Sequence, residues 1–179
     1  SAATVVAIAE AFVALPKPPR RSVLFAFVAA EEQGLLGSKY YAQHPTAPPG
    51  RLAADLNFDG AAIYGRTGSV EIIGRGKSSL EDLLELAAAR QKRVLVDETF
   101  PDRGFYYRSD QLNFARIGVP ALYFRSGVDV IGKPEGWGRE QRIQWEATHY
   151  HQPSDELDAS WDLSGAVEDA ALAFWVGAA

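Results

Sequence analysis

The sequence contains no cysteine, which excludes disulfide bonds, thiolate metal sites and cysteine nucleophiles. Any bound metal ion would therefore need histidine and carboxylate ligands. Methionine is also absent, and the first residues, SAATVVAIAEAF, already have the apolar spacing of an amphipathic helix. We therefore expect a chain that begins inside a domain.

Long apolar runs and clustered basic residues are missing as well. No stretch approaches the roughly 20 apolar residues of a membrane-spanning helix, so no membrane partner is expected. The 18 Lys and Arg residues are dispersed and outnumbered by 23 Asp and Glu, which argues against nucleic acid as the main partner. With 179 residues, of which 47% are hydrophobic, the chain has the size and composition of one globular domain.

Helix and strand patterns alternate along the chain. Short apolar runs are typical of strands that helices cover on both faces, and residues at helical spacing separate these runs. The predicted strands cover residues 22–30, 52–59, 69–74, 94–98 and 119–124; the predicted helices cover residues 2–13, about a dozen residues from 35, 78–93, 110–118 and 163–176; and residues 127–150 are expected to be irregular. The alternation predicts an α/β layered domain.

Three carboxylates follow two of the predicted strands. The stretch FVAAEEQGLLGSKYY places Glu31 and Glu32 after the first run, and LNFDG places Asp59 after the second. Ligand sites of α/β proteins collect at the carboxyl ends of strands, so these side chains are expected on one rim. The segment HYHQPSDE adds His149 and His151, and zinc accepts such a set of nitrogen and oxygen ligands.

Four segments, in order, carry a resemblance to a known family: AAEEQGLLGSKYY, LNFDG, RSDQLNFARIGVPALYF and YHQPSDE. Together they resemble the M28 family of zinc aminopeptidases over nearly the whole chain. The resemblance implies a three-layer α/β/α sandwich, zinc-exopeptidase-like, with a mostly parallel mixed central sheet. It also implies that residues 1–179 form a single partial catalytic domain with zinc as cofactor and peptides as substrates, and it favours a secreted or periplasmic protein.

The same resemblance implies a role for each site residue. Glu31 would be the general base, Glu32 and His151 would bind one zinc, Asp59 would bind the other, and Tyr150 would donate a hydrogen bond to the oxyanion. Such a reaction needs a carboxylate that receives the proton and is separate from the metal ligand, which suits two adjacent glutamates. Outside these motifs, the glutamates would fit a solvated helix start, Asp59 a turn and Tyr150 a packed aromatic.

Residues around these motifs are expected to have structural roles. Ser109 is a credible helix cap, and Asp110 is expected to be a cap or to support the site. Gln111 stands where the family usually has histidine. Asp155 is expected to fix the loop that carries His151.

The remaining histidines and tryptophans leave several interpretations open. His44 and His149 are expected at the surface and not as ligands. Trp137 and Trp145 fit a hydrophobic substrate pocket, core packing or a mobile lid equally well.

The chain also departs from the family pattern, because the histidine and the metal-bridging aspartate that precede this region in the family are absent. Glu32 and His151 remain for one metal and Asp59 for the other, whereas a catalytic zinc normally has three protein ligands. We therefore expect one zinc or none, an exposed sheet edge, and self-association or complementation by the missing N-terminal segment. A noncatalytic fragment or interaction module is the alternative, and a zinc-dependent glutaminyl cyclase is less favoured.

Overall fold

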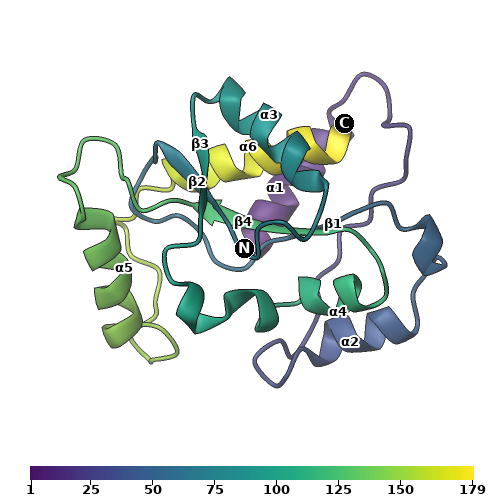
Figure 1. Ribbon diagram of the computed structural model, residues 1–179, viewed down its shortest axis with the longest axis horizontal. Helices are drawn as coiled ribbons and strands as arrows, with labels where there is room; N and C mark the ends of the chain where they lie inside the picture. The colour runs from purple at the N-terminus through teal and green to yellow at the C-terminus, as the bar shows by residue number, and fades with distance from the viewer.

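The computed structural model describes residues 1–179 and contains a four-stranded sheet between layers of helices (Figure 1). The strands are β1 (Asp55–Asn57), β2 (Ser69–Ile72), β3 (Val94–Asp97) and β4 (Ala121–Ser126), in the order β1-β4-β2-β3. β1 runs parallel to β4 and β2 parallel to β3, while β2 and β4 are antiparallel. The expected α/β sandwich with a mixed, mostly parallel sheet is confirmed.

One face of the sheet packs against three helices and forms the main core. These helices are α1 (Ala2–Val13), α3 (Leu80–Arg90) and α6 (Ser164–Ala178). Alternate residues of β2 and β4 point toward them, including the buried Val70 and Phe124. The apolar stripes of the helices cover these residues, which is why the helical spacing in the sequence predicts this layer well.

The opposite face of the sheet carries the candidate site. The helices α2 (Leu36–Gln43) and α4 (Gln111–Arg116) lie together on this side, whereas α5 (Trp137–Thr148) stands apart from them (Figure 1). The chain also contains three short 3-10 helices, at Pro49–Arg51, Pro101–Arg103 and Phe105–Tyr107. A smaller apolar cluster of Ile73, Tyr106, Leu112 and Tyr123 joins α4 to the sheet.

Three predictions from the sequence are wrong. Residues 22–30 form no strand, because no other segment of the chain pairs with them, and Leu24 and Phe27 are about 60% exposed. Residues 127–150 are not irregular throughout, because α5 occupies half of them after Gly136 turns the chain in a left-handed conformation. The helix expected from residue 35 is also shorter than a dozen residues.

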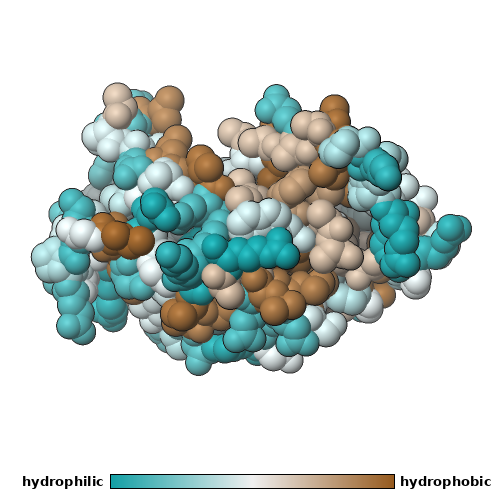
Figure 2. Space-filling model, turned by 90° about the horizontal axis from the view of Figure 1, so that it is seen from above, coloured by the Kyte–Doolittle hydropathy of each residue, from teal (hydrophilic) through white to brown (hydrophobic).

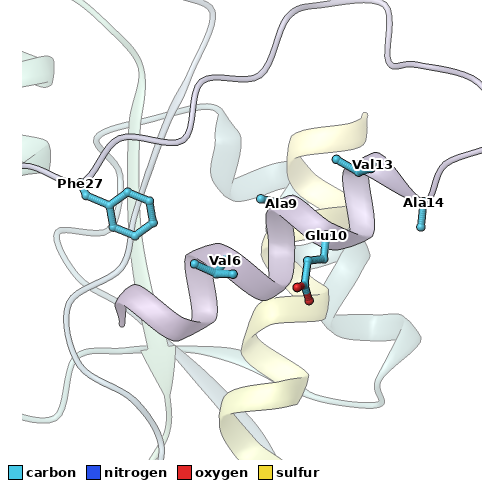
Figure 3. Close-up of a pocket in the computed structure, with 6 residues that line it drawn as sticks. All are labelled: Val6, Ala9, Glu10, Val13, Ala14 and Phe27. Atoms are coloured by element: carbon cyan, nitrogen blue, oxygen red, sulfur yellow. The ribbon is translucent and has the colours of Figure 1, made fainter.

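Apolar surface remains uncovered beside α1. Val6, Ala9, Val13 and Phe27 line most of a hollow of about 370 Å³ between α1 and the 22–30 segment (Figure 3). Seen from the side of α3 and α6, brown apolar residues gather in patches among polar ones (Figure 2). Self-association through such surface stays a prediction. None of the helices combines the length and apolar character needed to cross a membrane.

Candidate active site

A groove of about 1010 Å³ brings together the five side chains that the sequence predicts for the site. It is lined by Glu31, Glu32, Asp59, Tyr150 and His151 among others. These residues come from three separate segments: the turn before α2, the loop after β1 and the loop after α5. Their meeting supports the expectation that the motifs form one site.

The glutamate pair lies on a tight turn with unusual backbone conformations. Ala30 and Leu35 flank the pair, and both have left-handed φ values, 57° and 59°. The Leu35 amide donates to the Glu31 carbonyl at 2.8 Å, which closes the turn. Conformations of this kind cost free energy in residues other than glycine, so the surrounding contacts must maintain them.

Gly37, the second glycine of the turn segment, allows a close approach between α2 and the preceding chain. A Cβ atom at this position would lie 2.5 Å from the backbone nitrogen and oxygen of Ala29. The Gly37 amide itself donates to the Ala29 carbonyl at 2.9 Å. Only glycine fits this contact, which holds the turn against the start of α2.

Asp59 lies two residues beyond β1, as the strand-end argument predicts. The Tyr123 hydroxyl donates to the Asp59 backbone carbonyl at 3.2 Å, which fixes the loop to β4. The Asp59 side chain makes no hydrogen bond and is exposed in the groove. Its carboxylate is therefore open to a ligand.

His151 and Glu32 make a direct contact between the loop after α5 and the turn before α2. Nε2 of His151 lies 2.7 Å from Oε1 of Glu32, and both side chains are about half exposed. His151 has a left-handed φ of 57°, and its ring stacks on Tyr150 at 3.8 Å between centroids. The two side chains expected on one metal therefore meet in space.

The pKa of Glu31 is strongly perturbed. Burial, the largest cause, and the nearby carboxylates of Asp59, Glu32 and Asp110 together raise it from 4.5 to about 7, while His151 opposes them. Burial also raises the pKa of Tyr150, with a smaller contribution from Glu32. A carboxylate with a pKa near neutrality is suited to accept and return a proton.

The donor set is incomplete for a catalytic zinc. Glu32 and His151 converge, but the structure contains no group of three or more His, Asp or Glu side chains placed to hold a metal ion. Asp59 stands in the same groove without joining them. The side chains present supply two of the three protein ligands that such a zinc normally has.

The Ser-Asp-Gln segment supports the site differently from the prediction. Ser109 does not cap α4; its hydroxyl accepts a hydrogen bond from Asn57 at 2.8 Å. Asp110 occupies the N-cap position without a capping bond, and one of its carboxylate oxygens is buried without a partner. Gln111 is fully buried and accepts from Asn57 at 3.0 Å, so it ties β1 to α4.

The other predicted residues have mostly local roles. His44 bonds to the carbonyl of Tyr40, and His149 stacks on Trp145 at 4.3 Å, so neither contacts the carboxylates. Trp145 lines the groove, whereas Trp137 packs on Tyr64.

The loop with His151 is fixed by a residue other than the predicted one. The Ser154 hydroxyl donates to the carbonyl of Thr148 at 2.7 Å, which closes the loop onto the end of α5. The Asp155 side chain is exposed and makes no hydrogen bond. Asp155 was expected to fix this loop, but in the structure Ser154 makes the bond that does so.

A buried ion-pair cluster was missed by the sequence analysis. Glu71 of β2 is fully buried and pairs with Arg125 of β4 and Arg142 of α5, each at 2.9 Å. The Thr99 hydroxyl also donates to Glu71. The signal was a single glutamate within the apolar run SVEIIG. This cluster fastens α5 to the sheet and so supports the loop with His151.

Comparison with known proteins agrees with the fold and the motif order. The profile of Peptidase family M28 matches residues 1–175. The probable lipoprotein aminopeptidase LpqL of Mycobacterium tuberculosis is 30% identical over 97% of this chain and 37% of its own length. The probable leucine aminopeptidase 2 of Aspergillus oryzae is 30% identical over 77% of this chain and 29% of its own length.

Solved structures give the same result for the fold. BSAP, a zinc aminopeptidase from Bacillus subtilis, superposes with a TM-score of 0.70 at 18% identity, over 97% of this chain and 39% of that one. The Legionella pneumophila LapA aminopeptidase gives 0.69 at 16% identity, over 97% of this chain and 42% of that one. The chain thus spans between about three tenths and two fifths of the length of these proteins. With nearly its whole length matched by the profile, the chain belongs to peptidase family M28.

Proposed function

We propose that the chain carries part of the active site of a zinc-dependent aminopeptidase, which hydrolyses the N-terminal peptide bond of peptides. The observation that supports this most is the contact of 2.7 Å between His151 and Glu32, with Glu31 beside them. Two distant segments thus bring a candidate pair of metal ligands close to a separate carboxylate, and a metal-assisted hydrolase uses groups of both kinds.

The side chains divide the chemistry among themselves. Glu31, with a pKa of about 7, accepts the proton of the attacking water and returns it to the leaving amine. Tyr150, also in the groove, donates a hydrogen bond to the oxygen that gains negative charge. Glu32 and His151 would hold one zinc and Asp59 would contribute to a second, and a bound zinc would supply a Lewis acid for the scissile carbonyl.

The incomplete ligand set limits what residues 1–179 do alone. We expect one weakly bound zinc or none, and low activity, because Glu32, Asp59 and His151 are too few ligands for two zinc ions. Residues 1–179 would then be a single partial catalytic domain. The name of the Mycobacterium tuberculosis relative includes the word lipoprotein, which favours a location outside the cytoplasm for this chain too.

Hydrolysis of leucine p-nitroanilide by the chain at saturating zinc tests the proposal. Glu31→Gln should lower the zinc-dependent rate by about 10²–10⁴-fold without lowering zinc affinity, because only the proton acceptor is lost. Glu10→Gln on the exposed face of α1 is the matched control and should leave the rate unchanged. Equal rates in wild type and Glu31→Gln would refute the assignment of Glu31.

A noncatalytic module of the same fold is the second candidate, favoured by the lack of a complete group of ligands. It predicts no zinc-dependent hydrolysis by the wild-type chain at any zinc concentration. A glutaminyl cyclase is less favoured; with a peptide that begins with glutamine it would form the pyroglutamyl ring, and hydrolysis of that peptide without cyclisation would exclude it.

A further inference from the structure

The carboxylate-bearing turn contacts α4 through two buried polar side chains. Asn113 is 5% exposed and Ser38 is fully buried. The Asn113 amide donates to the Ser38 hydroxyl at 2.9 Å and to the Leu35 carbonyl at 3.3 Å. The Ser38 hydroxyl donates in turn to the Leu35 carbonyl at 3.1 Å.

These bonds converge on the residue whose backbone is least favourable. Leu35 has a left-handed φ of 59°, and its amide closes the turn onto the Glu31 carbonyl. Without supporting contacts, this left-handed conformation costs a leucine of order 1–3 kcal/mol relative to an ordinary backbone conformation. The three bonds to its carbonyl, from Ser38, Asn113 and the Lys39 amide, hold it in place.

The same helix also holds the Asp59 loop. Gln111, two residues before Asn113, is fully buried and donates to the Tyr106 carbonyl at 2.7 Å. Its side-chain oxygen accepts from Asn57 at 3.0 Å, two residues before Asp59. The short helix α4 therefore makes buried contacts with both segments that supply carboxylates, and α2 lies alongside it (Figure 1).

We propose that Asn113 is a positioning residue that acts through Ser38 and Leu35 to fix Glu31 and Glu32 relative to Asp59. The proposal rests on the proposed function for its consequence in zinc binding, but its geometric content is independent of zinc. It also gives the serine of the GLLGS segment a physical reason, since Ser38 is both acceptor for Asn113 and donor to Leu35.

Asn113→Leu removes both bonds while keeping the approximate size of the side chain. The first readout is native-state hydrogen exchange of the Leu35 and Gly37 amides, which close the turn. These amides should exchange at least about tenfold faster than the loss of global stability accounts for. Ser38→Ala is a smaller change and should also speed up the exchange of these amides. It replaces Asn113→Leu as the test if that variant fails to fold.

Leu84→Ala is the matched control, because Leu84 is fully buried in the core on the other face of the sheet. It lowers global stability without touching the turn. The comparison is made at equal global stability. The proposal would be overturned if the Leu35 and Gly37 amides exchanged no faster in Asn113→Leu and Ser38→Ala than in Leu84→Ala.

The second readout is affinity for zinc alone, by competition with a chromogenic chelator. Loss of supporting contacts behind metal ligands typically costs 10–100-fold, so Asn113→Leu should weaken zinc binding by about that factor. An unchanged affinity in Asn113→Leu would also overturn the positioning role. A wild-type chain that binds no zinc would agree with the incomplete ligand set, and the exchange experiment would then decide the role of Asn113.

Discussion

Replacing Glu31 by glutamine should stabilise the metal-free protein above neutral pH. The Glu31 carboxyl has a pKa of about 7 in the folded chain, against an ordinary value of 4.5, because burial and three neighbouring carboxylates disfavour its charge. Each pKa unit corresponds to about 1.4 kcal/mol, so the folded state carries up to ~3 kcal/mol of unfavourable free energy when Glu31 is ionised. Because the groove is open to solvent, which screens these charges, we expect about 1–2 kcal/mol.

The pH dependence gives the sign of this effect. Below about pH 4.5 Glu31 is protonated in both states, so Glu31→Gln should change the free energy of unfolding little. As the pH rises, the unfolded chain releases this proton first, and the wild-type protein loses stability until the pH passes about 7. Glutamine cannot ionise, so the gain from the substitution should grow over that range and then level off.

Urea denaturation of both proteins in chelator, at intervals from pH 4.5 to pH 8.5, measures the gain directly. Glu10→Gln, at an exposed position of α1, should change stability by less than about 0.5 kcal/mol throughout. A gain for Glu31→Gln that is the same at every pH, or a loss at pH 8, would refute the electrostatic explanation.

Three further substitutions test the packing that positions the site. Glu71→Ala leaves two buried arginines without their partner and should cost about 3–5 kcal/mol in urea denaturation; a cost below about 1 kcal/mol would contradict the account of the cluster. Gly37→Ala forces a Cβ against the backbone of Ala29 and should cost about 1–3 kcal/mol; an unchanged melting temperature would show that the contact yields easily. Leu172→Ala, at a fully buried position of α6, should cost about 2–5 kcal/mol, and a smaller loss would mean that the core refills the cavity.

The sequence predicts most of the layers because their signals are local. Helical spacing identifies α1, α3 and α6, and short apolar runs identify the four strands. The run at residues 22–30 has the same local signal but no partner strand in the chain, and pairing cannot be judged from one segment alone. α5 was missed because Gly136 and the tryptophans of residues 127–150 were interpreted as loop signals.

The site was predictable only in part for a similar reason. Asp59 follows β1, as the strand-end argument predicts, but Glu31 follows no strand, because residues 22–30 before it form none. The contact of His151 with Glu32 spans most of the chain and was expected only from the resemblance to the family. The bond from Asn113 to Ser38 joins residues 75 positions apart, and nothing in either local sequence indicates it.

Zinc titration of the 179-residue chain, followed by metal analysis after dialysis, tests the central claim most directly. The account predicts one zinc at most, lost on dialysis, and bound more weakly by about tenfold or more in both Glu32→Gln and His151→Ala, with urea stability changed little because both side chains are exposed. Two zinc ions retained through dialysis would contradict the incomplete ligand set, and zinc affinity that neither substitution changes would contradict the assignment of Glu32 and His151 as a metal-binding pair.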